Sequence, residues 1–341
     1  MSSSQYLRSV DFVEAPLVSV VIPTFNRRVL LVEAVESCLK QSYPNIEIII
    51  VDDGSTDSTE ELVNLQMAGV WSQRVRYITQ VNSGASAARN KGLSLAGGKY
   101  VQFLDSDDVL LDSKIQLQVE KLESTPYTSE MCSSYGRISA MRGDPPDSRS
   151  IGVQCNSPVG YMRKMTSIIH ALQTSAPLWR RDYLVARPGW REDIGLGDDL
   201  EYYMRLMRDA KDVCFISSEL FIVREHDGPH LSDVGKSRNQ VISAFLTHKS
   251  VVATIVSAGL WDDEIQWAVF RKARTLYANL MSVGNNNDLR EFEKWVISLH
   301  QQDETFTELK ILVAIRRVFG RKIILLSHGF LQFLKQKISL Y

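Results

Sequence analysis

Three aspartates lie within four residues directly after the apolar run 100–104, and they are Asp105, Asp107 and Asp108. Carboxylates this close repel one another and are costly to bury unless a cation lies among them. Such oxygen ligands suit Mg²⁺ or Mn²⁺, which take one or two protein carboxylates together with phosphate oxygens. If a strand continues through Asp105 and Asp107, both side chains point the same way and could bind one ion. From these residues alone, a helix N-cap at Asp108 or Asp112 is the alternative.

Two further polar segments also follow apolar runs. Residues 23–27 (PTFNR) come after the run 17–22, and residues 52–55 (DDGS) come after the run 46–51. Short runs rich in valine and isoleucine are typical of parallel strands that are covered on both faces. Ligands of such sheets bind outside the carboxyl ends of the strands. We therefore expect the three polar loops to form one site.

The alternation of apolar runs and helical patterns predicts an α/β fold with an open, mainly parallel sheet and helices on both faces. Pro23 is expected to end the first strand, and 213–224 is expected to be an edge strand. The other predicted strands are 17–22, 46–51, 75–79, 100–104 and 131–141. Helices are predicted at 85–96 and 113–122, and long helical patterns follow at 237–258, 262–283, 288–300 and 305–340.

Composition excludes several classes of protein. The net charge of −1 argues against a nucleic-acid-binding surface. The four cysteines are far apart and form no CxxC pair, which fits a reducing compartment rather than a zinc site or a disulfide framework. The first 16 residues contain no apolar core of signal-peptide length, and no uninterrupted apolar run approaches a membrane span. We therefore expect a cytoplasmic protein.

The segments around the three loops resemble the family 2 glycosyltransferases, which have the GT-A fold. The matching segments are VSVVIPTFNR (18–27), QSYPNIEIIIVDDGSTDST (41–59) and NSGASAARNKGLSLAGGKYVQFLDSDD (82–108), in the family's order and spacing. The strong resemblance covers 16–111 and returns at 175–206. It implies a GT-A domain at 17–235, with a donor half at 17–111 and an acceptor half at 112–235. An N-terminal arm at 1–16 and a helical region at 236–341 would flank it.

The resemblance also implies roles for individual residues. Asp105 and Asp107 would be the acidic pair that holds metal and donor, and His226 would be a further metal ligand, with His230 as the alternative histidine. Arg89 would lie near the base or the diphosphate, although a solvent-facing arginine on a helix is the other interpretation. The expected donor-binding residues are Pro23, Thr24, Asn26, Asp53, Arg89, Asp105, Ser106 and Arg224.

Asp199 is the expected catalytic base, because a sugar hydroxyl is a poor nucleophile until a positioned carboxylate takes its proton. The family usually has a Glu-Asp pair where this chain has Asp198 and Asp199. The alternative is that both aspartates only complement a helix dipole. Trp179 and Trp190 flank this segment, and each could stack on an acceptor sugar or pack in the core.

The expected function is transfer of a sugar, of the hexosyltransferase type, with inversion and with Mn²⁺ or Mg²⁺. The donor would be a nucleotide-diphosphate sugar, with UDP as the expected nucleotide. The acceptor would be a hydroxyl of a sugar, a lipid-linked oligosaccharide or a protein, as in polysaccharide or glycoconjugate synthesis. The alternatives are a nucleotidyltransferase on a related fold and a non-catalytic nucleotide-sugar-binding module.

The C-terminal segment 309–341 carries seven basic residues and no acidic ones. Its apolar residues recur at steps of three or four, which predicts a basic amphipathic helix. Such a helix could contact anionic lipid at the inner face of the membrane. A terminal helix that packs on its own domain is the alternative. The helices after 236 carry no motif that indicates chemistry, and they could mediate homo-oligomer assembly.

Overall fold

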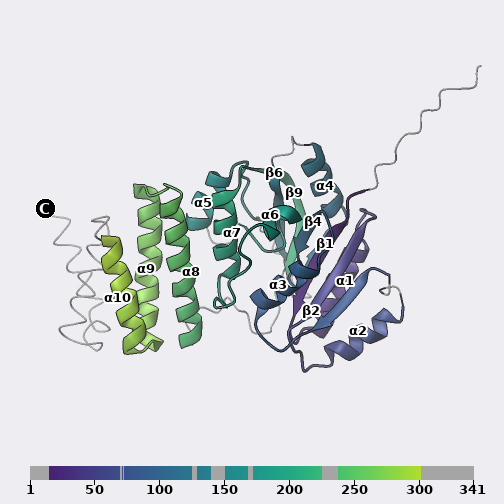
Figure 1. The fold of residues 1–341 in the computed structure, drawn as a ribbon, viewed down its shortest axis with the longest axis horizontal. Coiled ribbons are helices and arrows are strands. Elements are labelled where there is room, and N and C mark those ends of the chain that lie inside the picture. Colours follow the sequence, from purple (N-terminus) through teal and green to yellow (C-terminus); the bar gives the residue numbers. More distant parts are fainter. Residues whose placement is uncertain are drawn as a thin grey trace, which may run out of the picture.

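A mixed sheet of nine strands, followed by three long helices, organises the chain (Figure 1). The computed structural model describes residues 15–69, 71, 73–124, 129–139, 150–167, 172–224 and 237–300. Along the sheet the strand order is β3-β2-β1-β4-β8-β6-β9-β5, and β7 pairs with β6. The strands are β1 Val18–Thr24, β2 Ile46–Asp52, β3 Val75–Thr79, β4 Tyr100–Phe103, β5 Asp108–Leu110, β6 Ser129–Ser139, β7 Ser150–Ile151, β8 Leu178–Arg180 and β9 Asp212–Arg224. The helices are α1 Arg28–Leu39, α2 Thr59–Met67, α3 Ala85–Leu95, α4 Lys114–Ser124, α5 Pro158–Ser167, α6 Arg181–Val185, α7 Asp198–Asp209, α8 Arg238–Ser257, α9 Asp263–Val283 and α10 Asn286–His300.

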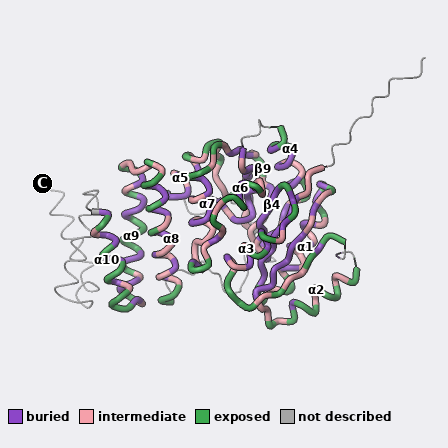
Figure 2. The backbone as a smooth tube through the Cα atoms, viewed as in Figure 1, coloured by how far each residue is buried: buried purple, intermediate pink, exposed green. Residues whose placement is uncertain are grey.

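The first four strands are parallel, as their apolar composition predicted. β1 lies between β2 and β4, and β2 in turn pairs with β3. Every residue of β1 is buried, and Figure 2 shows burial concentrated along the central strands while much of α2 faces solvent. Because these strands run the same way, their carboxyl ends and the loops that follow them meet at one edge of the sheet.

Pro23 does not end the first strand, contrary to the expectation from the sequence. β1 continues to Thr24 and stays in register with β2 through the pair Pro23 and Val51. Odd-numbered residues of this segment direct their backbone polar groups toward β4, because the carbonyls of Leu17 and Val21 accept bonds from that side. The N–H that Pro23 lacks would therefore also point toward β4. β4 has already ended there, so the proline removes no ladder hydrogen bond.

The strand 212–224 is not an edge strand, which corrects a second expectation. β9 pairs in parallel with β6 on one side and antiparallel with β5 on the other. The residues directly after the acidic loop form β5, whose three residues pair with Phe221, Ile222 and Val223. This short strand covers the outer side of β9, so the edge of the sheet is β5. Its sequence, DVL, is too short to reveal a strand by periodicity.

Three of the four predicted C-terminal helices are present as α8, α9 and α10. Ser237 starts α8 with a capping box, and the side chain of Asp262 caps α9. Figure 1 shows α8, α9 and α10 side by side beyond α7 and α5, away from the parallel half of the sheet. By length and hydropathy α8 alone among the described helices could cross a membrane. Half of its most apolar window is buried within the protein, as in a core helix.

Several expected features lie outside the described residues. These are most of the arm at 1–16, the proposed domain boundary at 235/236, the helix expected at 305–340 and the basic segment 309–341.

Candidate active site

The loops after β1 and β2 are joined to each other. The backbone N–H of Asp53 donates to the carbonyl of Thr24 at 2.9 Å. Asn26 has a positive φ of 51°, which turns its amide toward the second loop, where its Oδ1 accepts from the N–H of Thr56 at 2.7 Å. The N–H of Asn26 donates to Ser55 Oγ at 2.8 Å. Two of the predicted donor loops therefore form one continuous surface.

Thr24 and Asp53 lie at the buried base of this surface. Thr24 is 3% exposed, and its hydroxyl has no hydrogen-bond partner among the described residues. Asp53 accepts three bonds from the next loop, from the amide of Gln80 at 2.8 Å and from the N–H groups of Ser83 and Gly84 at 2.8 and 2.7 Å. Asp53 therefore positions the segment that opens α3.

The acidic loop after β4 does not continue the strand, which corrects the expectation that Asp105 and Asp107 share one strand face. β4 ends at Phe103, and each of the two carboxylates binds its own arginine. Asp105 accepts from Arg89 at 2.8 Å, and Asp107 pairs with Arg27. Asp108 is the first residue of β5 and accepts from Ser175 at 2.6 Å, so it is not a helix N-cap.

Burial and neighbouring negative charge raise the pKa of two carboxylates in this loop, Asp105 and Asp108. Burial first, and then the charge of Asp107, raise the pKa of Asp105 against the opposing effect of Arg89. Burial and the charges of Asp105 and Asp107 raise the pKa of Asp108 well above its usual range. The loop therefore holds three carboxylates close together, two of them with raised pKa values, an arrangement that favours a bound cation.

Two carboxylates after β4, beside the loops that follow β1 and β2, fit Mg²⁺ or Mn²⁺, because such ions complete their coordination with phosphate oxygens and water. Within the described residues no group of three or more His, Cys, Asp or Glu side chains is arranged to hold a metal. A site on this loop would thus rely on Asp105 and Asp107 together with ligands from the donor. The remaining predicted ligand, His226, lies outside the described residues.

Arg89 is the central residue of the site and not a solvent-facing arginine. It is 5% exposed, its guanidinium lies 4.5 Å from the centre of the Trp190 ring, and it binds two carboxylates. One is Asp105 at 2.8 Å and the other is Asp198 at 2.6 Å. Although burial alone would lower the pKa of Arg89, these carboxylates raise it. Arg89 therefore links the acidic loop to the first residue of α7.

Asp199 lies in the first turn of α7, as predicted, and is half-buried. Its Oδ1 accepts from the N–H of Leu200 at 2.7 Å. Burial, followed by the charge of Asp198, raises the pKa of Asp199 to about 6 against the lowering effects of Leu200 N–H and Arg89. A carboxylate with this pKa is ionised at neutral pH and is basic enough to take a proton from a hydroxyl.

Asp198 has a different role from Asp199. It accepts from Ser86 at 3.0 Å and from Arg89, both on α3, so its carboxylate anchors the helix that presents Asp199. The interpretation that both aspartates only complement the helix dipole is therefore wrong for Asp198.

Arg224 binds the backbone of the acidic loop. Its guanidinium donates to the carbonyls of Asp107, Ser106 and Leu30 and to the carboxylate of Glu33. Ser106 is 5% exposed and contributes its carbonyl to this contact. The structure thus places Arg224 and Ser106, both predicted to bind the sugar donor, at the acidic loop. The four hydrogen bonds that Arg224 donates all go to protein atoms.

Trp179 and Trp190 pack in the core, with exposures of 0% and 3%. Trp179 stacks near Tyr203 with ring centres 5.5 Å apart, and Trp190 lies against Phe103 at 5.3 Å. Neither ring is available to an acceptor sugar, so the core interpretation is the correct one.

Two further features were not predicted from the sequence. Burial lowers the pKa of Lys272 on α9, and the charge of Asp199 opposes this effect. The C-terminal helices therefore contribute a cation near the candidate base. Asn90, next to Arg89, donates to Trp190 O and Glu192 Oε1 at 2.9 Å and thereby holds the segment before α7. Because neighbouring residues of a helix point to different sides, the helical pattern at 85–96 could have indicated that Asn90 contacts a different segment from Arg89.

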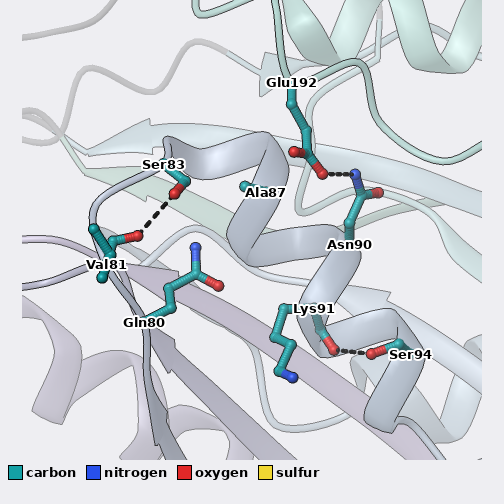
Figure 3. A pocket seen from close by; sticks show the side chains of 8 residues that line it. All are labelled: Gln80, Val81, Ser83, Ala87, Asn90, Lys91, Ser94 and Glu192. Carbon is teal, nitrogen blue, oxygen red and sulfur yellow. Dashed lines mark hydrogen bonds between the residues drawn. The ribbon is translucent and has the colours of Figure 1, made fainter.

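A hollow of about 460 Å³ lies beside α3 (Figure 3). Gln80, Val81, Ser83, Ala87, Asn90, Lys91, Ser94 and Glu192 line it. None of the predicted catalytic, donor-binding or metal-binding residues is among them. The candidate chemistry is therefore at the carboxyl ends of the strands and not in this hollow.

The chain is similar in sequence to known glycosyltransferases. Residues 19–183 match the family described as Glycosyl transferase family 2. An uncharacterized glycosyltransferase, EpsJ, of Bacillus subtilis (strain 168) is 29% identical over 218 residues, which are 62% of this chain and 62% of EpsJ. A Campylobacter jejuni enzyme named GalNAc(5)-diNAcBac-PP-undecaprenol beta-1,3-glucosyltransferase is 40% identical over 109 residues, 31% of this chain and 34% of that enzyme. The chain spans less than two thirds of the length of these relatives.

Solved structures show the same fold at low sequence identity. S. aureus TarS 1-349 in complex with UDP matches with a TM-score of 0.64 and 16% identity, over 89% of this chain and 88% of that one. The mannosyltransferase PcManGT from Pyrobaculum calidifontis, in complex with GDP-Man and Mn²⁺, matches with a TM-score of 0.53 and 16% identity, over 90% and 88%.

Proposed function

We propose that this chain, which contains a family 2 glycosyltransferase domain of GT-A fold as its motifs predicted, transfers a sugar from a nucleotide-diphosphate sugar to a hydroxyl group. The observation that carries the proposal is the chain of ion pairs Asp105–Arg89–Asp198. It brings the acidic loop and the helix of the candidate base into one site, although they are far apart in the sequence.

The loops after β1 and β2 would hold the nucleotide. The buried hydroxyl of Thr24, unpartnered within the described residues, supports this because such a group costs free energy unless a ligand satisfies it. Pro23 and Asn26 shape the same edge, and Asp53 would keep the loop at 80–84 in place for the base or ribose. UDP is the proposed nucleotide.

Asp105 and Asp107 would hold Mg²⁺ or Mn²⁺ together with the donor diphosphate. A divalent cation at this point neutralises the negative charge that develops on the leaving nucleotide diphosphate. Arg27 and Arg89, now paired with these carboxylates, lie where they would also face the phosphates. Both guanidinium groups would therefore contribute to donor binding.

Asp199 would take the proton of the acceptor hydroxyl as that oxygen attacks the anomeric carbon. The bond from that carbon to the diphosphate breaks as the new glycosidic bond forms, and the electron pair leaves with the nucleotide diphosphate. One carboxylate base opposite the leaving group is consistent with inversion. The pKa of about 6 for Asp199 supports this role.

Two other functions are less well supported. A nucleotidyltransferase should carry a glycine-rich phosphate loop near the first strand, and residues 23–28 (PTFNRR) contain no glycine. A non-catalytic binding module would not need a carboxylate of raised pKa beside the acidic loop. A donor panel that detects the released nucleotide diphosphate and the glycosylated product, with and without Mn²⁺, tests all three. Metal-independent release of pyrophosphate, or binding without turnover, would contradict the proposed transfer.

We propose that the protein works in the cytoplasm, at the inner face of the membrane if its acceptor is lipid-linked. The segment 309–341 would make the lipid contact through its basic amphipathic pattern. Flotation with anionic liposomes tests this, because truncation after residue 308 should leave the protein at the bottom of the gradient. Flotation of the truncated chain would contradict the proposal.

A further inference from the structure

We infer that helix α8 is a positioning element for the candidate base, because Ser243 and Thr247 bind the turn that leads into α7 and thereby place Asp199. The inference rests on the proposed function, since it concerns the geometry of the base. It gives the C-terminal helices, which carry no catalytic motif, a defined part in turnover.

The turn at 195–197 is attached to α8 by three hydrogen bonds. Ser243 Oγ accepts from the N–H groups of Gly195 and Leu196, both at 2.8 Å. Thr247 Oγ1 donates to the carbonyl of Leu196 at 2.7 Å. Residues four apart lie one above the other on one face of a helix, so both hydroxyls face the same turn. Both side chains are at least nine-tenths buried, so water competes little for these bonds.

The backbone of the turn also presses against α8. Gly197 precedes α7 with a φ of +74°, a conformation that side chains other than glycine rarely adopt. A Cβ atom at Gly197 would lie 3.1 Å from Cγ2 of Thr247. Close contact and hydrogen bonding therefore restrict the turn two residues before Asp199.

The first turn of α7 is held from both sides. On the α8 side, Ser250 donates to Glu201 Oε1 at 2.8 Å, and this buried carboxylate also binds Arg205. On the α3 side, Arg89 and Ser86 bind Asp198. Asp199 lies between these attachments, and a displacement of about 1 Å at a catalytic group can cost about 100-fold in rate. Loosening the α8 side should thus slow transfer without disturbing the donor loops.

The test compares matched substitutions within α8. Thr247→Val and Ser243→Ala remove the bonds to the turn. Thr254→Val and Ser257→Ala are the controls, because those hydroxyls bond only to backbone carbonyls of α8 itself. We expect Thr247→Val to lower kcat about tenfold while the donor KM and the affinity for UDP stay those of the wild type. Thr247→Ser, which keeps the hydroxyl, should restore kcat.

Hydrogen exchange provides a readout that does not depend on turnover. Amides at 195–201 should exchange faster in Thr247→Val and Ser243→Ala than in the two controls. Equal kcat in Thr247→Val and Thr254→Val, or a parallel loss of UDP affinity, would overturn the inference. If Thr247→Val does not fold, Ser243→Ala against Ser257→Ala decides by the same criteria. A wild-type protein that binds UDP but transfers no sugar contradicts the proposed function itself, whereas an active wild type with an equally active Thr247→Val overturns only the role of α8.

Discussion

The donor side and the base side of the site are stabilised in different ways. On the donor side, the loops after β1 and β2 bind each other across 29 residues of sequence, from Asn26 to Ser55. The loop after β3 binds Asp53 across 30 residues. On the base side, Arg89 reaches Asp198 across 109 residues, and Thr247 reaches Leu196 across 51.

This difference separates binding from turnover. The donor loops follow adjacent parallel strands, so the sheet alone brings them together. The base is placed by α3 on one side and α8 on the other, and neither attachment is local. We therefore expect changes on the donor side to remove binding and changes on the base side to remove turnover while binding persists.

The largest effect is expected for Asp107→Ala on the donor side. Transfer and metal-dependent donor binding should be lost, because the substitution removes a proposed metal ligand. The fold should persist, because the Asp107 side chain is 25% exposed and fills no core volume. Calorimetry of UDP binding with and without Mn²⁺, together with an unchanged melting temperature, checks this. Asp209→Ala, at a surface ion pair on α7, is the control. Normal turnover in the variant, or full wild-type activity in excess chelator, would refute the metal assignment.

The next effect is expected for Asp199→Asn on the base side. Asparagine keeps the size of the side chain but cannot accept the proton, so transfer should fall about 10²–10⁴-fold. UDP affinity should stay unchanged. Because the pKa of Asp199 is raised in the folded protein, ionisation opposes folding at neutral pH, and the variant should be as stable as the wild type or more stable at pH 8. A collapse of donor affinity would place Asp199 in the donor site instead.

Arg89→Lys tests the residue that joins the two sides. A lysine ammonium cannot bind Asp105 and Asp198 at once in the planar fork that the guanidinium provides. Loss of one charged hydrogen bond costs about 1.5–3 kcal/mol, so we expect UDP affinity and kcat each to fall about 10- to 100-fold. Arg76→Lys, at an exposed position, is the control. A variant in which only one of the two quantities changes would show that the two sides are not coupled through Arg89.

The smallest effect is expected from pH in the wild-type protein. With a pKa of about 6, Asp199 is protonated at lower pH and no longer acts as a base. We expect kcat/KM to fall about tenfold for each pH unit below 6, while UDP affinity changes less. A pH series of transfer rates in the wild type and in Asp199→Asn checks this. The same acid limb in both proteins would show that another group titrates.

Much of the donor side could be predicted from the sequence, because continuous apolar runs of the length typical of buried strands each end in a distinct polar motif. The positions of β1 to β4, the three loops and the family followed from such local patterns. The departures were also local in origin. The sequence does not reveal that the pairing of β1 with β4 ends at Val21, before Pro23 is reached. Nor does it reveal that Asp108–Leu110 pair with β9.

The sequence by itself determined which residue types meet at the carboxyl ends of the strands, since strand order and chain direction place those loops together. Only the tertiary structure decided how the charges pair. Asp105 and Asp107 bind different arginines, Asp198 anchors α7, and a serine and a threonine of α8 hold the turn before Asp199. The physical reason is that a hydrogen bond or ion pair requires the distance between two side chains to be right to within a few tenths of an ångström. Periodicity along the chain carries no information about partners about 50 or 100 residues away.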